Sequence, residues 1–166
     1  MKFQIFAPLF TAFLLVACSI SSSLPVPQVL PVFQAEDTRW FKLEQTDADG
    51  TVIQTSLLAV QPEKDMLRFV QTDALGAPVS RQTVSKKGWR NDGFVAPNNS
   101  SRRLFAAMLP LLDGNDKIYP QQQTKKQGGA TVYFDRNQEL WRCEVSDGLI
   151  KITFPDRTGW RITPLE

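Results

Sequence analysis

Apolar and polar residues alternate along most of the chain from about residue 38 onward. Ile150, Ile152 and Phe154 predict one buried face of a strand, and Lys151 and Thr153 between them predict a face in contact with water. The same pattern predicts strands over 39–46, 51–61, 65–72, 78–85, 88–94, 130–135, 139–145, 149–154 and 159–163. Asp-Gly pairs between some of them favour tight hairpin turns. The pattern therefore predicts an antiparallel sheet.

One segment, residues 101–112, has helical spacing instead. Its apolar face consists of Leu104, Met108, Leu111 and Leu112. Ser100 or Ser101 is expected to cap its start. Pro110 predicts a kink or a break, and Gly114 suits the C-terminal cap. The helix either simply covers the sheet or encloses an apolar groove together with it.

The N-terminus has a different pattern, in which Lys2 precedes an apolar run over residues 3–17. That run is shorter than the roughly 20 residues of a membrane-spanning helix, and it is typical of an export signal. Its end, Leu15-Val16-Ala17-Cys18, is similar to the lipobox of bacterial lipoproteins. The resemblance implies that Cys18 carries diacylglycerol and becomes the new N-terminus. The alternative is an ordinary signal peptide with a chance cysteine.

These patterns divide the chain into three parts. Residues 1–17 are the predicted lipoprotein signal, 18–37 a lipidated Pro- and Ser-rich tether, and 38–166 the folded domain. Ser19, in place of an aspartate, favours the outer membrane over retention at the inner membrane, as the sorting rule of enteric lipoproteins implies. Residues 121–129 are polar, with two lysines and two glycines, and predict a mobile loop.

The composition argues against several classes of function. Lys and Arg number 19 against 17 Asp and Glu, so no concentrated basic face for nucleic acid is expected. The chain has no histidine, nucleophile motif or phosphate-binding loop, so neither catalysis nor a cofactor or metal is expected. The Asp47-Ala48-Asp49-Gly50 run is read as a hairpin turn and not as a calcium loop. Cys143 is read as a buried small hydrophobe and not as a reactive thiol.

The segment from Arg68 to Val79 resembles a hairpin of the outer-membrane lipoprotein receptor LolB: a strand, a short loop containing Leu75-Gly76, and a second strand. From about Trp40 onward the chain also resembles the DUF3261 lipoproteins, which are often encoded with aryl-polyene lipid genes. These resemblances imply a mainly β (α+β) fold, an unclosed antiparallel half-barrel with a short helical lid over an acyl-binding cavity. They also imply that Leu75 protrudes and touches the membrane. The alternative is that Leu75 folds back under the sheet.

The expected function is non-enzymatic lipid handling at the periplasmic face of the outer membrane. The protein would bind the acyl chains of a lipid or lipoprotein and assist their transfer, which includes aryl-polyene lipid export. The rival functions are a structural or assembly lipoprotein that binds an envelope protein through a sheet edge, and, ranked last, an enzyme of polyene-lipid maturation. For each residue proposed to line the cavity, plain core packing is the alternative. Those residues are Trp40, Leu57, Phe69, Trp89, Leu104, Phe105, Met108 and Trp141.

Overall fold

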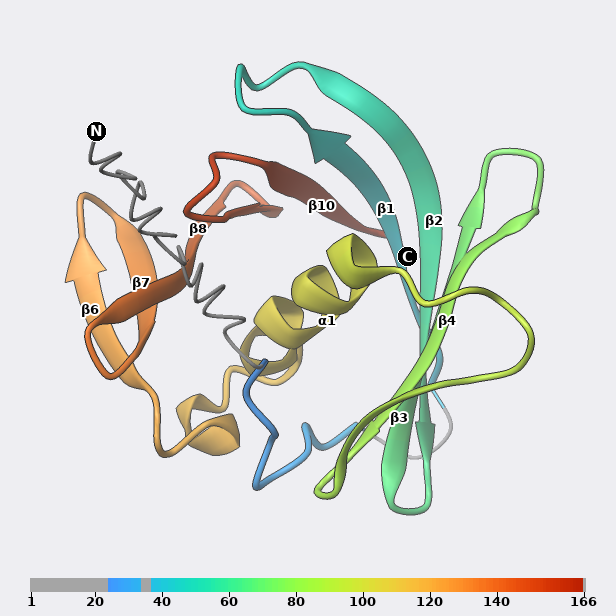
Figure 1. Cartoon of the computed structure of the whole chain (residues 1–166), viewed down its shortest axis with the longest axis horizontal. Coiled ribbons are helices and arrows are strands. Elements are labelled where there is room, and N and C mark those ends of the chain that lie inside the picture. The colour runs from blue at the N-terminus through green and yellow to red at the C-terminus, as the bar shows by residue number, and fades with distance from the viewer. Residues whose placement is uncertain (1–23, 34–36, 166) are drawn as a thin grey trace, which may run out of the picture.

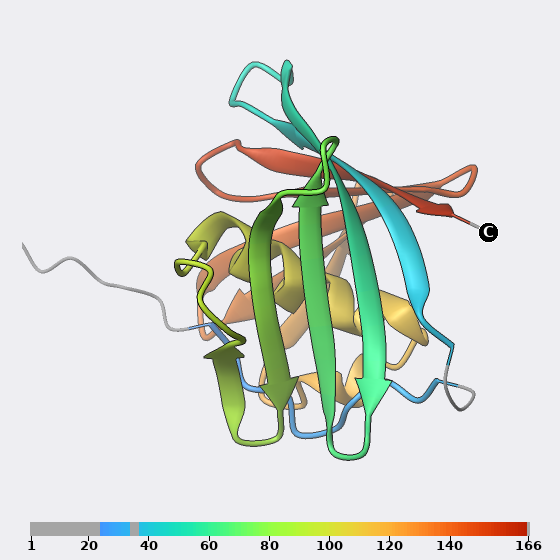
Figure 2. The same cartoon turned by 90° about the vertical axis from the view of Figure 1, so that its right-hand side faces the viewer.

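One continuous antiparallel sheet dominates the computed structural model, which describes residues 24–33 and 37–165. In those residues the strand order is β5-β4-β3-β2-β1-β10-β9-β8-β7-β6. The sheet curls strongly, but its edge strands β5 and β6 do not pair, so it stays open (Figures 1 and 2). The strands are β1 (Arg39–Thr46), β2 (Val52–Glu63), β3 (Met66–Asp73), β4 (Pro78–Ser85), β5 (Gly88–Asn91), β6 (Gln123–Gln127), β7 (Ala130–Asp135), β8 (Gln138–Ser146), β9 (Leu149–Thr153) and β10 (Gly159–Leu165). The predicted mainly β, unclosed architecture is therefore confirmed.

The path of the chain explains why the helix lies on the concave side of the sheet. Strands β1 to β5 run outward to one edge, and β6 to β10 run back from the other edge to the centre. There β10 pairs with β1, from Trp40↔Leu165 to Thr46↔Gly159. The crossing between the two edges is made by α1 (Asn99–Leu112) and the short 3₁₀ helix η1 (Asp116–Ile118). Figure 1 shows α1 inside the curve of the sheet.

The apolar face of α1 packs onto the inner face of the sheet and fills most of the interior. Leu104, Phe105 and Leu109 are fully buried. The ring of Phe105 stacks on Phe69 of β3, with 4.7 Å between the ring centroids. Within the described residues, no helix is long and apolar enough to cross a bilayer. The helix therefore covers the sheet, and any open space lies beside it.

The start of α1 differs from the sequence prediction. Asn98 is the N-cap, because its side-chain oxygen accepts a hydrogen bond of 3.0 Å from the Ser101 backbone N–H. The Ser101 hydroxyl is buried and donates to Oε1 of Gln71 on β3 at 2.6 Å. Pro110 does not break the helix, which continues to Leu112. Gly114 follows with a φ of 68°, as its predicted role at the C-terminal end requires.

The described part of the predicted tether belongs to the folded domain, which corrects the expected boundary near residue 38. Residues 24–33 run along one end of the curled sheet (Figures 1 and 2). Leu24, Leu30 and Phe33 pack against the core, and the backbone N–H of Gln28 donates to the Ile118 carbonyl at 3.0 Å. The prolines keep this segment out of helix and sheet, as predicted, but its apolar side chains bury surface that a free tether would leave in water.

The expected mobile loop at 121–129 is also wrong, because Gln123–Gln127 forms edge strand β6. All five of its residues are exposed, so the strand has no apolar face that alternation could reveal. Gly128 and Gly129 join it to β7 with φ values of 55° and 85°, which suits a two-residue hairpin turn. At the opposite edge, β5 ends at Asn91, three residues earlier than predicted.

The run at Asp47 is a hairpin turn, as predicted. Its carboxylate Oδ1 accepts hydrogen bonds from the backbone N–H groups of Asp49 and Thr51, at 3.0 and 2.9 Å. Gly50 closes the turn with a φ of 83°. The Asp47 carboxylate is thus used by the backbone of its own turn.

Candidate functional site

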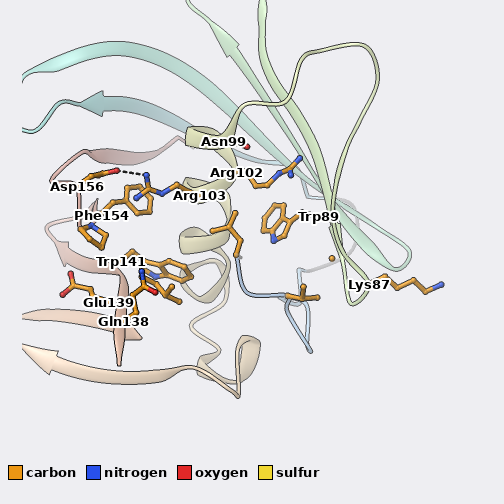
Figure 3. Close-up of a pocket in the computed structure, with 15 residues that line it drawn as sticks. Lys87, Trp89, Asn99, Arg102, Arg103, Gln138, Glu139, Trp141, Phe154 and Asp156 are labelled. Atoms are coloured by element: carbon orange, nitrogen blue, oxygen red, sulfur yellow. Dashed lines mark hydrogen bonds and ion pairs between the residues drawn. The ribbon is translucent and has the colours of Figure 1, made fainter. Parts of the chain in front are cut away.

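A large lateral pocket lies between the two halves of the open sheet, with a volume of about 840 Å³. One side is formed by β5, the other by the start of β8 and the turn that follows β9. The first turns of α1 and the start of the N-terminal segment complete it (Figure 3). Its lining residues are Leu24, Val26, Lys87, Gly88, Trp89, Asn99, Arg102, Arg103, Gln138, Glu139, Leu140, Trp141, Phe154, Pro155 and Asp156.

Two tryptophans lie on opposite sides of the lateral pocket (Figure 3). Trp89 comes from β5, and its ring centroid lies 5.8 Å from that of Phe69. Trp141 comes from β8, is only 1% exposed, and packs against Tyr133 with 5.4 Å between ring centroids. In the described part of the chain neither indole N–H has a hydrogen-bond acceptor, although both nitrogens are buried. The pocket therefore combines apolar walls with two unsatisfied donors.

The two carboxylates in the wall are each engaged by an arginine. Glu139 accepts two hydrogen bonds from the Arg142 guanidinium, at 2.8 and 2.7 Å, and these hold the pKa of Glu139 below its ordinary value. Asp156 accepts a bond of 2.8 Å from Arg103 of α1, drawn as a dashed line in Figure 3. Among the described residues, neither carboxylate is left to repel an anion.

Arg102, the third arginine near the pocket, is bound differently. Its Nε donates to Oε1 of Gln82 at 2.7 Å, and its Nη2 donates to Oδ1 of Asn91 at 2.6 Å. Both acceptors are neutral amide oxygens, so they orient the guanidinium without neutralising it. No carboxylate within the described ranges forms an ion pair with Arg102. The wall of the pocket therefore carries an uncompensated positive charge.

The residues predicted to line one cavity lie in four different places: two pockets, the core and the surface. Trp89 and Trp141 line the lateral pocket. Trp40 and Met108 line a separate, smaller pocket of about 260 Å³, between the C-terminal part of α1 and the pair β1 and β10. The other four line neither of these two pockets. Phe69, Leu104 and Phe105 are fully buried in the core, and Leu57 is exposed.

The exposure of Leu57 has a simple cause. Successive side chains of a strand point to opposite faces, so Leu57 and Leu58 cannot both face the core. Leu58 is fully buried and Leu57 is 41% exposed. The assignment of Leu57 to an internal cavity is therefore wrong, and for Phe69, Leu104 and Phe105 the core-packing alternative holds.

Sequence patterns did not single out several residues of the pocket. Leu24 and Val26 belong to a segment expected to be a tether, and Arg102 to a helix considered only for its apolar face. The sequence gives one signal for the pocket residues of this segment: Leu24 and Val26 are apolar, whereas a tether in contact with water is expected to be polar. Cys18, the predicted lipid attachment site, lies outside the described residues.

Leu75 lies at the tip of the turn between β3 and β4 and is 94% exposed. Asp73 Oδ1 shapes this turn by accepting bonds from the backbone N–H groups of Leu75 and Ala77, both at 2.9 Å. Gly76 has a φ of 85°. The side chain thus points into solvent, as predicted, and does not fold back under the sheet. Figures 1 and 2 place this turn at the opposite end of the sheet from residues 24–33.

Cys143 lies on β8 and is only 3% exposed. Burial raises the pKa of its thiol to about 12, so the thiolate is not populated at neutral pH. The prediction that Cys143 is buried is therefore confirmed, and its low reactivity stays a prediction.

Across 24–33 and 37–165, no three Asp, Glu or Cys side chains are grouped so that they could hold a metal ion. What the lateral pocket offers is a mixed polar and apolar surface, two buried indole donors and the positive charge of Arg102. The chain matches no known protein-family model, and none of the curated proteins matches it significantly.

Proposed function

We propose that this protein is a lipid-anchored, non-enzymatic protein at the periplasmic face of the bacterial outer membrane. Its lateral pocket would bind an acyl chain of a lipid or lipoprotein and assist the transfer of that molecule within the envelope. The observation that carries this proposal is the open pocket of about 840 Å³ with Trp89, Leu140, Trp141 and Phe154 in its walls. Sites for small molecules typically have volumes of about 300–1,000 Å³. The exposed lining of this pocket is mixed, slightly more polar than apolar, which suits a ligand with both a polar and an apolar part.

The position of the pocket along the chain supports this role. Leu24 lines the pocket, and only six residue steps separate it from Cys18. A fully extended chain of that length spans at most about 20 Å. If Cys18 carries lipid, the mouth of the pocket is held close to the bilayer surface. A ligand could then leave the membrane and enter the pocket without crossing much water.

No energy source is needed for such a transfer. Each methylene of an acyl chain that leaves water contributes roughly 0.8 kcal/mol, so a chain moves readily between an apolar pocket and a bilayer. The direction follows from the difference in affinity between the two sites. The uncovered side of the curled sheet provides the path of entry.

The alternative of an assembly lipoprotein would use a free sheet edge to add a strand from a partner. Both edges of this sheet are poorly suited to that role. β5 has four residues, and β6 carries Lys125 and Lys126 on an entirely exposed strand. Short edges and lysines are the features by which proteins discourage strand addition. We therefore rank this alternative second.

Native mass spectrometry of the protein extracted from membranes tests the proposed function. We expect a mature chain that begins at Cys18, carries covalent acyl groups and retains a non-covalently bound lipid. The Cys18→Ala variant should lack the covalent acyl mass and serves as the control. A stoichiometric envelope protein in place of lipid would support the assembly alternative. A chain without acyl mass would contradict the anchoring.

A further inference from the structure

The two buried polar atoms without a hydrogen-bond partner in the lining of the lateral pocket are of one kind. The indole N–H groups of Trp89 and Trp141 can only donate hydrogen bonds, so each of them needs an acceptor. Arg102 adds a charge that no described carboxylate balances. The two acidic side chains in the wall, Glu139 and Asp156, are already bound to arginines. The pocket is thus complementary to a ligand that is rich in acceptors and negatively charged.

The position of Arg102 makes this charge usable. It lies on the first turn of α1, and Figure 3 shows it beside Trp89. Gln82 is almost fully buried and holds the guanidinium by its Nε, so the side chain is already oriented and loses little entropy when an anion binds. Lys87 at the rim differs, because Figure 3 shows its side chain directed away from the other labelled residues.

Resting on the proposed function, we infer that the lateral pocket is specific for an anionic amphiphile. The carboxylate or phosphate of the head group would be held by Arg102, with the Trp89 and Trp141 N–H groups as further donors. The alkyl chain would lie against Leu24, Leu140 and Phe154. Charge-assisted hydrogen bonds contribute more than neutral ones, because ionised groups attract more strongly in a partly dry pocket. A neutral molecule with the same chain should therefore bind much more weakly.

The experiment uses the full-length protein in nanodiscs of zwitterionic phosphatidylcholine, with empty nanodiscs as the blank. Isothermal titration calorimetry compares five probes: decanoate, decyl phosphate, decanol, decyltrimethylammonium and inorganic phosphate. We expect decanoate and decyl phosphate to bind at least about tenfold more tightly than the two ten-carbon probes without negative charge, as one charged hydrogen bond suffices for that ratio. Inorganic phosphate alone should not bind measurably. The tighter of the two anions then identifies fatty acids or phospholipids as the ligand class.

Matched variants test which residues of the pocket cause the preference for the anionic probes. Arg102→Gln should remove most of the preference for the anion, whereas Arg90→Gln, an exposed arginine of β5 outside the pocket lining, should keep it. Because Arg102 also holds Gln82 and Asn91, Trp141→Phe provides a second test, which removes the indole N–H group together with part of the ring and leaves Arg102 unchanged. Its control is Trp160→Phe, a buried tryptophan that does not line the pocket.

The results also separate this inference from the proposed function. If decanol binds as tightly as decanoate, the pocket binds alkyl chains regardless of charge. That result would contradict the inferred specificity for anions but not the proposed function. If none of the ten-carbon probes binds, both the inferred specificity and the proposed function are contradicted. If inorganic phosphate binds as tightly as decyl phosphate, the site recognises a free anion and the amphiphile assignment is wrong.

Discussion

Nη1 of Arg103 donates a hydrogen bond of 2.8 Å to Oδ2 of Asp156, 53 residues further along the chain. The same guanidinium lies over the ring of Phe154, 4.1 Å from its centroid. Together these contacts tie α1 to the turn between β9 and β10, at the wall of the lateral pocket. The helix is therefore attached to both halves of the sheet, since Ser101 bonds to Gln71 in the other half.

The Arg103–Asp156 bond should make a small, pH-dependent contribution to stability. Partial burial alone would raise the pKa of Asp156, but the bonds from Thr158 and Arg103 together lower it below its ordinary value. The stabilisation is thus present at neutral pH and is lost as the pH falls through the folded-state pKa. Because the Asp156 side chain is about half exposed, we expect Asp156→Asn to cost roughly 0.5 kcal/mol at pH 7.

Urea unfolding at pH 7 and at pH 2 measures this difference. Asp49→Asn, an exposed aspartate of the β1–β2 turn, is the control and should change stability little at either pH. A destabilisation by Asp156→Asn that is equally large at pH 2 would show that charge is not its cause.

Ser101→Ala should be clearly destabilising, because the buried Oε1 of Gln71 would lose its donor. An unsatisfied buried polar group costs about 1–3 kcal/mol, and we expect a loss in that range from chemical denaturation. Ser100→Ala is the matched control. Ser100 is half-buried, and its hydroxyl accepts a 3.2 Å bond from Gln45, so its loss should cost less than about 1 kcal/mol. Equal losses for the two variants would contradict the assigned role of Gln71.

Cys143 should react with thiol reagents only after unfolding. Burial raises its pKa to about 12, so the folded protein at pH 8 presents almost no thiolate. In a Cys18→Ala background Cys143 is the sole thiol. The rate of its reaction with 5,5′-dithiobis(2-nitrobenzoate) should then follow the unfolded fraction as urea is added. Rapid labelling in the absence of urea would show that β8 opens in the native state.

Alternation predicts nine of the described strands because most of them have one buried face. It misses β6 because none of the five residues of that strand is buried. The strand therefore pairs with β7 without any alternation of apolar and polar residues. The Gly128-Gly129 turn was the available signal. Residues 24–33 were misread for the opposite reason. Prolines exclude regular structure, but they do not exclude packing, and Pro25, Pro27 and Pro31 are all buried.

The site was less predictable than the fold, because the pocket forms only when distant segments meet. Trp89 and Trp141 could be chosen as large apolar residues, yet nothing in the local sequence distinguishes them from Phe69, which lies in the core. The importance of Arg102 depends on which partners it finds. Its acceptors, Gln82 and Asn91, lie on β4 and β5, so its uncompensated charge becomes visible only in three dimensions.

Leu75→Glu should leave stability unchanged but slow the delivery of lipid to an acceptor membrane at the end of the sheet opposite residues 24–33. The side chain is 94% exposed, so no core contact is lost. Insertion of a leucine into a bilayer can contribute roughly 1.5–3 kcal/mol, which corresponds to at least about a tenfold effect on membrane contact. Ala74→Glu adds the same charge to the same exposed turn but removes much less apolar surface.

Thermal denaturation and transfer of a fluorescent lipid between vesicles check this prediction. Ala74→Glu should reduce transfer less than Leu75→Glu. If both variants transfer lipid at the wild-type rate, Leu75 does not touch the membrane during delivery. A large drop in melting temperature for Leu75→Glu would contradict its exposure.

The most direct test of the central claim is to locate a bound acyl chain on the protein. The measurement is photo-crosslinking with a diazirine-bearing fatty acid in native membranes, followed by mass spectrometric mapping of the labelled residues. We predict labels at residues 24, 26, 89, 138–141 and 154–156, where the walls of the lateral pocket lie. An excess of unlabelled fatty acid should remove them. Labels confined to Leu57 and other exposed residues, insensitive to that competition, would contradict acyl binding in this pocket.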